Sequence, residues 1–252
     1  MSTDLPRCCF ELDHRWPLPD SLPDLALARV RFDAAALDEQ DFPRRGLSAP
    51  RGVAKRQAEH LAGRVCAHAA LARLHGHGTW LARDGEGLPV WPAGLLGSLT
   101  HSHGRAAAVA GHSARWQGLG LDLERLIRPD RAERLAGEIL TPGERQALAG
   151  SDPEHYAERV TLAFSLKESL FKALYPLVRQ RFYFQEAAVV EYHPQGRARL
   201  RLLADLGPAW PAGRELDGHF APDDGYLLSL VAVPAAGRAR PPRRPLTATH
   251  YI

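Results

Sequence analysis

The most constraining feature of this sequence is a helical pattern that runs without a break from residue 151 to residue 176. Ser151-Asp152-Pro153 offers capping side chains followed by a proline, which is a typical helix start. Apolar residues then recur at steps of three and four, until Pro176 is expected to stop the helix. The pattern therefore predicts one long helix in this part of the chain.

A second long helix is predicted between Val53 and His75, where small and apolar residues repeat at the same steps and glycines follow. Segments with the pattern of strands flank both helices. They are residues 25–32, 106–111, 118–124, 182–192, 198–203 and 226–233. The first of these segments is expected at a sheet edge. The arrangement predicts an α+β fold.

The same pattern predicts two halves, residues 1–115 and residues 116–252. The division falls between Gly111 and Gly118. The proline-rich and basic tail that begins near residue 237 is expected to be disordered.

The composition is that of a folded globular chain, with 252 residues of which 45% are hydrophobic and 24% charged. No stretch approaches about 18 uninterrupted apolar residues, and charges occupy the start of the chain where a secretory signal needs an apolar core. We therefore expect a cytoplasmic protein with no membrane partner. Cys8, Cys9 and Cys66 match neither a disulfide framework nor zinc-site spacing, so they are expected to be reduced and structural.

The charge balance favours anionic partners. The formal net charge is +3 and the sequence pI is near 8.9. This excess of positive charge is too small to indicate nucleic acid by itself. Only three basic residues are lysines, at positions 55, 167 and 172. A composition bias explains the arginine excess, but ammonium and guanidinium groups differ in hydration and reach. The two lysines within six residues of each other therefore mark a segment of interest.

Asp122 and Glu124 form a D-x-E pair inside a predicted strand. Residues two apart on a strand share a face and lie about 6.5 to 7 Å apart, so both carboxylates can point at one cation. A hard divalent ion such as Mg²⁺ takes one or two carboxylates and completes its shell with water and phosphate oxygens. Gly118 and Gly120 would let a ligand or a backbone come close. Two ordinary surface acids on a strand edge are the alternative.

The segment from Phe164 to Tyr175, FSLKESLFKALY, places Glu168 and Lys172 four residues apart on one helix face. Such a pair commonly stabilises a helix by about 0.2 to 0.5 kcal/mol. These two side chains are, however, embedded among Phe, Leu, Ala and Tyr. A carboxylate and an ammonium in apolar surroundings require partners, and a metal with a phosphate satisfies both.

Two further segments suit phosphate. The glycine-bounded segment at 97–104, GSLTHSHG, offers hydroxyls, imidazoles and backbone N–H groups and is expected to be a tight turn. Zinc binding by His101 and His103 lacks a third clustered ligand, and an incidental turn is the other alternative. Basic residues precede and enter the first long helix and can hold a phosphate or an acidic protein surface, or can form a solvated face. They are Arg44, Arg45, Arg51, Lys55, Arg56 and Arg64.

The order and spacing of these segments resemble the Sfp-type 4′-phosphopantetheinyl transferases, in particular the branch of enterobactin synthase component D. The matching motifs are K-R-x-A-E-H-L-A-G-R at 55–64, G-x-P-x-W-P at 87–92, G-S-x-T-H at 97–101, G-L-D-L-E at 120–124 and F-S-x-K-E-S-L-F-K at 164–172. The last two motifs together form a specific signature, and the resemblance spans residues 44 to 192.

The resemblance implies two similar α/β halves in a pseudo-twofold arrangement, with the active site in the cleft between them. It places the nucleotide of coenzyme A on the side of residues 1–115, and the metal and the catalytic helix in residues 116–252. It implies an enzyme that moves the 4′-phosphopantetheine arm of coenzyme A to a serine of an apo carrier protein and releases 3′,5′-ADP. Mg²⁺, or Mn²⁺ in its place, is the implied cofactor. The implied partners are coenzyme A and acidic acyl, peptidyl or aryl carrier proteins. We expect a monomer, since a two-halved site needs no partner subunit.

The resemblance also implies roles for individual residues. Asp122, Glu124 and Glu168 are the implied metal ligands, and Glu168 is the implied base for the carrier serine. Lys172, with Lys167 nearby, is expected to steady the diphosphate. The other implied coenzyme A contacts are Lys55, Arg56, Arg64, Gly87, Pro89, Ser98, Thr100 and His101, of which His101 also belongs to the catalytic set.

Two positions depart from the family pattern, and two other functions remain open. Thr100 stands where many members have serine and keeps the hydroxyl, whereas Leu88 replaces a basic residue and puts that loop's contacts in doubt. A metal-dependent nuclease or phosphohydrolase also uses paired acids and a lysine, and release of nucleotides from DNA or RNA would favour it. A basic nucleic-acid-binding module would instead show salt-sensitive DNA retention without transfer.

Overall fold

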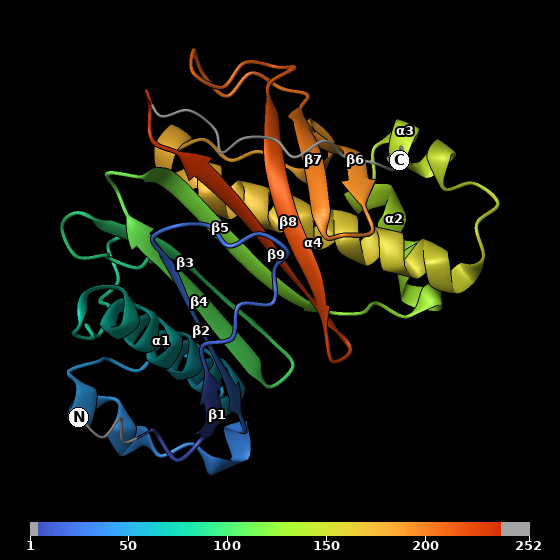
Figure 1. Cartoon of the computed structure of the whole chain (residues 1–252). Helices are drawn as coiled ribbons and strands as arrows, with labels where there is room; N and C mark the ends of the chain where they lie inside the picture. The colour runs from blue at the N-terminus through green and yellow to red at the C-terminus, as the bar shows by residue number, and fades with distance from the viewer. Residues whose placement is uncertain (1–4, 238–252) are drawn as a thin grey trace. The chain divides into compact units, whose positions relative to one another are not determined.

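The computed structural model describes residues 5–237, and these divide into two compact units (Figure 1). The first unit contains residues 5–16 and Leu22–Trp116, and the second contains Pro17–Ser21 and the described chain from Gln117 onward. The predicted basic tail at 238–245 lies outside the described residues. Among the helices of residues 5–237, none is long and apolar enough to cross a membrane.

One long helix packs on one sheet in the first unit (Figure 1). The strands run in the order β1 (Cys9–Asp13), β2 (Leu25–Phe32), β4 (Arg105–His112) and β3 (Leu95–Ser102), and all three neighbouring pairs are antiparallel. The helix α1 (Ala54–His75) contacts β2, β3 and β4. Three short 3₁₀ turns, at Ala34–Ala36, Glu39–Asp41 and Pro43–Arg45, precede the helix.

The small residues of α1 and β4 explain their close packing. Ala58, Ala62 and Ala69 on the helix are buried, as are Ala106 and Ala108 on the strand. Because alanine adds only a methyl group, the helix axis can lie close to the sheet. Gly76 ends the helix in the left-handed conformation at φ 90°, which glycine adopts without strain.

The second unit repeats this plan with a larger sheet. Its strands lie in the order β5 (Trp116–Arg125), β9 (Tyr226–Pro234), β8 (Glu215–Asp223), β7 (Arg197–Leu202) and β6 (Ala187–His193). Three helices, α2 (Pro129–Ile139), α3 (Pro142–Ala147) and α4 (Pro153–Val178), complete the unit with a 3₁₀ turn at Phe184–Glu186. The long helix α4 packs on β9, β6 and α2. A salt bridge of 2.6 Å between Asp20 and Arg197 ties Pro17–Ser21 to β7.

The fold class is therefore confirmed as α+β with two similar halves, each a long helix on an antiparallel sheet. The pseudo-twofold arrangement and the cleft stay predictions.

Three local predictions were wrong, and strand pairing explains two of them. The strand at 25–32 is not an edge, because the unpredicted β1 pairs with its outer side. Residues 97–102 extend as β3, so that only His103 and Gly104 form the turn, both with positive φ as a two-residue hairpin requires. The helix α4 continues two residues past Pro176, because a proline in the last turn costs a single backbone hydrogen bond.

Candidate active site

The strand β5 and the helix α4 lie in direct backbone contact. A Cβ added at Gly120 would meet the carbonyl oxygen of Ser169 and lie 2.6 Å from the backbone nitrogen of Ala173. One at Gly118 would meet the carbonyl oxygen of Ala173. Asp122 lies on the same face of the strand, since side chains two apart share a face. The absence of side chains at the two glycines therefore allows α4 to approach Asp122.

Replacing Gly120 by alanine is expected to lower the free energy of unfolding by about 1 to 3 kcal/mol, because the backbone of α4 must move to make room. Chemical denaturation measures the change. Gly137→Ala is the matched control, since nothing lies within 4 Å of a Cβ at that position and alanine stabilises a helix interior. Equal stability of Gly120→Ala and the unmodified protein would contradict the close contact.

Asp122 is buried, with 3% of its surface exposed, and both of its carboxylate oxygens accept hydrogen bonds from α4. Its Oδ1 accepts a hydrogen bond of 2.6 Å from Nζ of Lys172, and its Oδ2 accepts one of 2.9 Å from the hydroxyl of Ser165. Nζ of Lys172 also donates to the carbonyl of Leu121 at 3.2 Å. Asp122 and Lys172, which are 50 positions apart in the sequence, are thus brought together, as predicted.

Glu168 lies one helical turn before Lys172 and is half-buried. Burial raises the pKa of the Glu168 carboxyl, the nearby Lys172 ammonium opposes this rise, and the Asp122 carboxylate adds to it. Both charges therefore lie close enough to Glu168 to act on it. A carboxylate with a raised pKa is a stronger base than one in water, which suits it to accept a proton.

Glu124 is half-buried and lies two residues beyond Asp122 on the same strand. Within residues 5–237, no three side chains of His, Cys, Asp or Glu are grouped closely enough to hold a metal ion. The chain by itself therefore does not assemble Asp122, Glu124 and Glu168 as a complete cage. Mg²⁺ does not require one, because water and substrate phosphates complete its shell.

Lys167 has a different environment from the one expected beside a diphosphate. Its Nζ donates to Oε2 of Glu144 at 2.7 Å and to the carbonyl of Ile139 at 2.8 Å, and its side chain is 1% exposed. Glu144 also accepts from the backbone nitrogens of Thr141 and Val189. Burial lowers the pKa of Lys167, and Glu144 opposes the change. The ammonium of Lys167 thus joins α4 to the ends of α2 and α3 and to β6.

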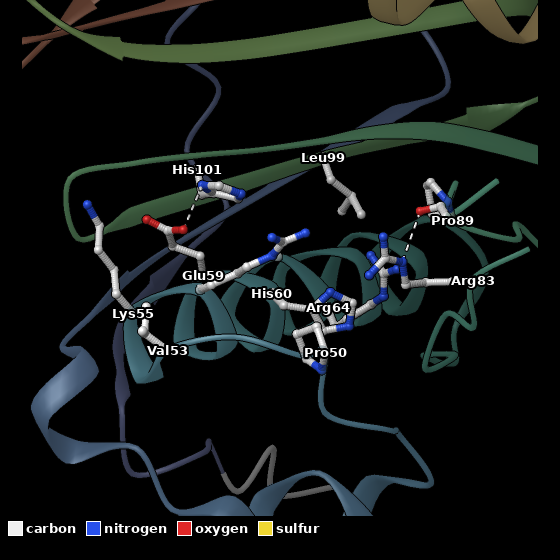
Figure 2. A pocket seen from close by; sticks show the side chains of 13 residues that line it. Pro50, Val53, Lys55, Glu59, His60, Arg64, Arg83, Pro89, Leu99 and His101 are labelled. Carbon is white, nitrogen blue, oxygen red and sulfur yellow. Dashed lines mark hydrogen bonds and ion pairs between the residues drawn. The ribbon is translucent and has the colours of Figure 1, made fainter.

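The first unit contains a pocket with a cavity volume of about 580 Å³ (Figure 2). Lys55, Glu59, His60 and Arg64 reach it from α1, and His101 reaches it from β3 (Figure 2). Its full lining is Pro50, Val53, Lys55, Arg56, Glu59, His60, Gly63, Arg64, Arg83, Gly87, Pro89, Leu99 and His101. Basic side chains outnumber the single carboxylate, so the pocket suits an anion.

Arg64 is the most buried cation of this pocket, with 4% of its surface exposed. Burial and the charge of Arg83 lower its pKa to about 10, and within residues 5–237 its Nε has no hydrogen-bond partner. Burial, with the charges of Arg64, Arg83 and His101, lowers the pKa of His60 to about 4. An anion would stabilise the guanidinium of Arg64, because an unpaired buried charge is costly.

Six of the predicted coenzyme A contacts meet in this pocket. They are Lys55, Arg56, Arg64, Gly87, Pro89 and His101. Ser98 and Thr100 do not line it; both are buried, and strand alternation places them on the face of β3 opposite to Leu99 and His101. Arg44 and Arg45 are instead paired with Asp38 and Asp41.

Arg83 is the pocket guanidinium that sequence reasoning missed. Its Nε donates to the carbonyl of Gly87 at 3.0 Å, and an isolated bridge joins Arg83 to Pro89. Leu88 lacks the basic side chain of the family pattern, but Arg83 brings a guanidinium to the pocket from the same loop. The signal in the sequence was weak, because one arginine among 29 carries little information.

Comparisons with known proteins match both units. The family model described as "4′-phosphopantetheinyl transferase N-terminal domain" matches residues 46–111, and "4′-phosphopantetheinyl transferase superfamily" matches residues 118–231. The transferase Svp of Streptomyces mobaraensis is 36% identical over 227 residues, which cover 86% of this chain and 90% of Svp. The chain belongs to the 4′-phosphopantetheinyl transferase superfamily.

Two further transferase-related proteins give similar matches. The 4′-phosphopantetheinyl transferase Npt of Nocardia iowensis is 31% identical over 192 residues, covering 72% of this chain and 84% of Npt. Enterobactin synthase component D of Escherichia coli (strain K12) is 39% identical over 147 residues, which cover 57% of this chain and 68% of component D. The resemblance to Sfp-type transferases is therefore confirmed.

The two matched ranges cover different groups of candidate site residues. The N-terminal domain range covers the whole pocket lining, from Pro50 to His101. The superfamily range covers Asp122, Glu168 and Lys172. The anion pocket and the acid–lysine group thus belong to different matched domains of the transferase.

Proposed function

We propose that this transferase moves the 4′-phosphopantetheine arm of coenzyme A to a serine of apo carrier proteins and releases 3′,5′-ADP. The observation that carries the proposal is the meeting of Asp122, Lys172 and Glu168 in the second unit. Family membership supports both coenzyme A and carrier proteins as partners. We further propose that the enzyme acts as a monomer in the cytoplasm.

The pocket of the first unit is the proposed site for the nucleotide part of coenzyme A. The unpartnered Nε of Arg64 and the nearby Arg83 offer charge-assisted hydrogen bonds to phosphate oxygens. Neutral His60 and Leu99 provide a flat and an apolar surface for a base. A volume of about 580 Å³ lies within the range of small-molecule sites, about 300 to 1,000 Å³.

The acids of the second unit fit Mg²⁺ better than a softer metal, because every candidate ligand is an oxygen. Oδ1 of Asp122 already faces a cation, and Glu168 lies near enough for Asp122 to raise its pKa. We propose Asp122 and Glu168 as ligands, with Glu124 as the third. The ion would neutralise diphosphate oxygens, which is the usual contribution of a metal in phosphoryl transfer.

The side chains then have separate tasks in the reaction. Glu168 accepts the proton of the carrier serine while the serine oxygen forms a bond to the β-phosphorus of coenzyme A. The bond from that phosphorus to the bridging oxygen breaks, and its electron pair leaves with 3′,5′-ADP. Lys172 neutralises charge that develops on the phosphate oxygens. Lys167 has a structural task, since its ammonium is held by Glu144.

Mass spectrometry of an apo carrier protein tests the function. After incubation with this enzyme, coenzyme A and Mg²⁺, we expect the carrier to gain the mass of one phosphopantetheine, and a carrier with its acceptor serine replaced by alanine to gain none. An unmodified carrier, in a preparation that a known transferase modifies, would overturn the proposal. Release of nucleotides from DNA or RNA would instead favour the hydrolase.

Arg83→Met is expected to raise the KM for coenzyme A about tenfold with little change in kcat, because it removes a charged contact to the nucleotide worth about 1.4 kcal/mol. Steady-state kinetics with a fluorescent coenzyme A measures both constants. Arg51→Met removes the same charge outside the pocket lining and should leave the KM unchanged. Equal KM values for the two variants would exclude Arg83 from the nucleotide site.

A further inference from the structure

Three buried hydroxyls connect α4 to β9 beside Asp122. Ser165 and Ser169 lie on α4, Ser229 lies on β9, and all three are 0% exposed. The distances are 2.8 Å from Ser165 Oγ to Ser229 Oγ and 2.8 Å from Ser169 Oγ to Ser229 Oγ. Alanine would fill these positions without burying a polar group, so packing alone does not explain three serines.

Each serine hydroxyl has one proton, which decides the direction of these bonds. Ser165 donates its proton to Oδ2 of Asp122 at 2.9 Å. Its bond to Ser229 must therefore use the proton of Ser229. That leaves Ser169 to donate toward Ser229, where the hydroxyl oxygen lies at 2.8 Å and the carbonyl oxygen at 3.1 Å. The protons thus point one way, from Ser169 through Ser229 and Ser165 to Asp122.

The chain ends on one oxygen of Asp122, and a cation faces the other. Oδ2 is held by Ser165, whereas Oδ1 faces the ammonium of Lys172 at 2.6 Å. Hydrogen bonds in a chain polarise one another, so a hydroxyl distant from the carboxylate still strengthens the last bond. Mg²⁺ demands near-ideal octahedral geometry, and a carboxylate that cannot rotate loses less entropy when it binds.

We propose that Ser169, Ser229 and Ser165 form a directed hydroxyl chain that fixes the orientation of the Asp122 carboxylate, which would hold the divalent cation. The three serines are positioning residues, because they act through Asp122. The inference rests on the proposed function for its role in catalysis, but the binding of a cation can be measured without any transfer.

Titration of Mn²⁺ followed by electron paramagnetic resonance, in the absence of coenzyme A, tests the chain. Ser165→Ala should raise the Mn²⁺ dissociation constant about tenfold, and Ser229→Ala about threefold although Ser229 does not touch Asp122. The double variant should equal Ser165→Ala alone, because the chain is already cut. Ser229→Thr, which keeps a hydroxyl, should bind Mn²⁺ more tightly than Ser229→Ala.

Thr161→Val is the matched control. Thr161 is also 0% exposed on α4 and donates its hydroxyl to the carbonyl of Ala157, outside the chain. The Thr161→Val variant should be less stable than the unmodified protein but should bind Mn²⁺ with the same affinity.

Two outcomes would overturn the inference: a Mn²⁺ affinity of Ser229→Ala equal to that of the unmodified protein, or additive effects in the double variant. Absence of carrier modification by the unmodified protein would refute the proposed function and leave these binding measurements valid.

Discussion

Glu168→Gln should lower the rate of phosphopantetheine transfer about 1,000-fold, within the usual range for loss of a general base. The amide cannot accept the proton of the carrier serine, and it also removes a negative ligand from the proposed cation site. The environment of Glu168 suits it to act as a base, because burial and the Asp122 carboxylate raise its pKa while the Lys172 ammonium opposes the rise. Fluorescent transfer to an apo carrier protein measures the rate.

Loss of rate in this variant should not follow from unfolding. A neutral amide is easier to bury than a carboxylate next to Asp122, so Glu168→Gln should be at least as stable as the unmodified enzyme. Glu158→Gln is the matched control on the same helix, since the Glu158 side chain is 57% exposed and should tolerate the change. A turnover of Glu168→Gln near that of the unmodified enzyme would refute the assigned base.

Lys167→Met should lower the free energy of unfolding by about 3 to 5 kcal/mol, the usual cost of removing one partner of a buried ion pair. The variant leaves the carboxylate of Glu144 buried at 2% exposure without its ammonium. It also removes the donor to the carbonyl of Ile139. Chemical denaturation followed by circular dichroism measures this loss.

The double variant Lys167→Met, Glu144→Gln separates buried charge from lost packing. The glutamine no longer needs a cation and still offers one oxygen to the backbone nitrogens of Thr141 or Val189. We expect the double variant to be more stable than Lys167→Met alone. A single variant as stable as the unmodified enzyme would show that Lys167 is not engaged with Glu144 in solution.

Local signals predicted the two long helices. The side chain of Asp152 caps α4, and Thr141 and Glu144 form the capping box of α3. These signals lie within four residues of the element they start, so sequence alone carries them. The strand β8 escaped prediction because glycine, proline and charged residues interrupt its alternation, and its pairing with β7 and β9 provides what the pattern lacks.

For the site, the sequence by itself determined which chemical groups were available. The D-x-E pair and the Glu168–Lys172 spacing are local features of one strand and one helix, and the structure brings Asp122 to Lys172 as expected. The spacing could not distinguish Lys167 from Lys172. Positions five apart on a helix point about 140° apart, and only the packing around α4 shows which ammonium meets Glu144 and which meets Asp122.

Only the tertiary structure decided which distant groups act together. Arg83 joins Arg64 at the pocket because a loop folds back on itself, and Ser229 joins Ser165 because β9 lies under α4. No local pattern records such meetings, since they depend on strand order and on how closely a helix can approach a sheet. Propensity and spacing describe neighbours along the chain, whereas hydrogen bonds and charges act between neighbours in space.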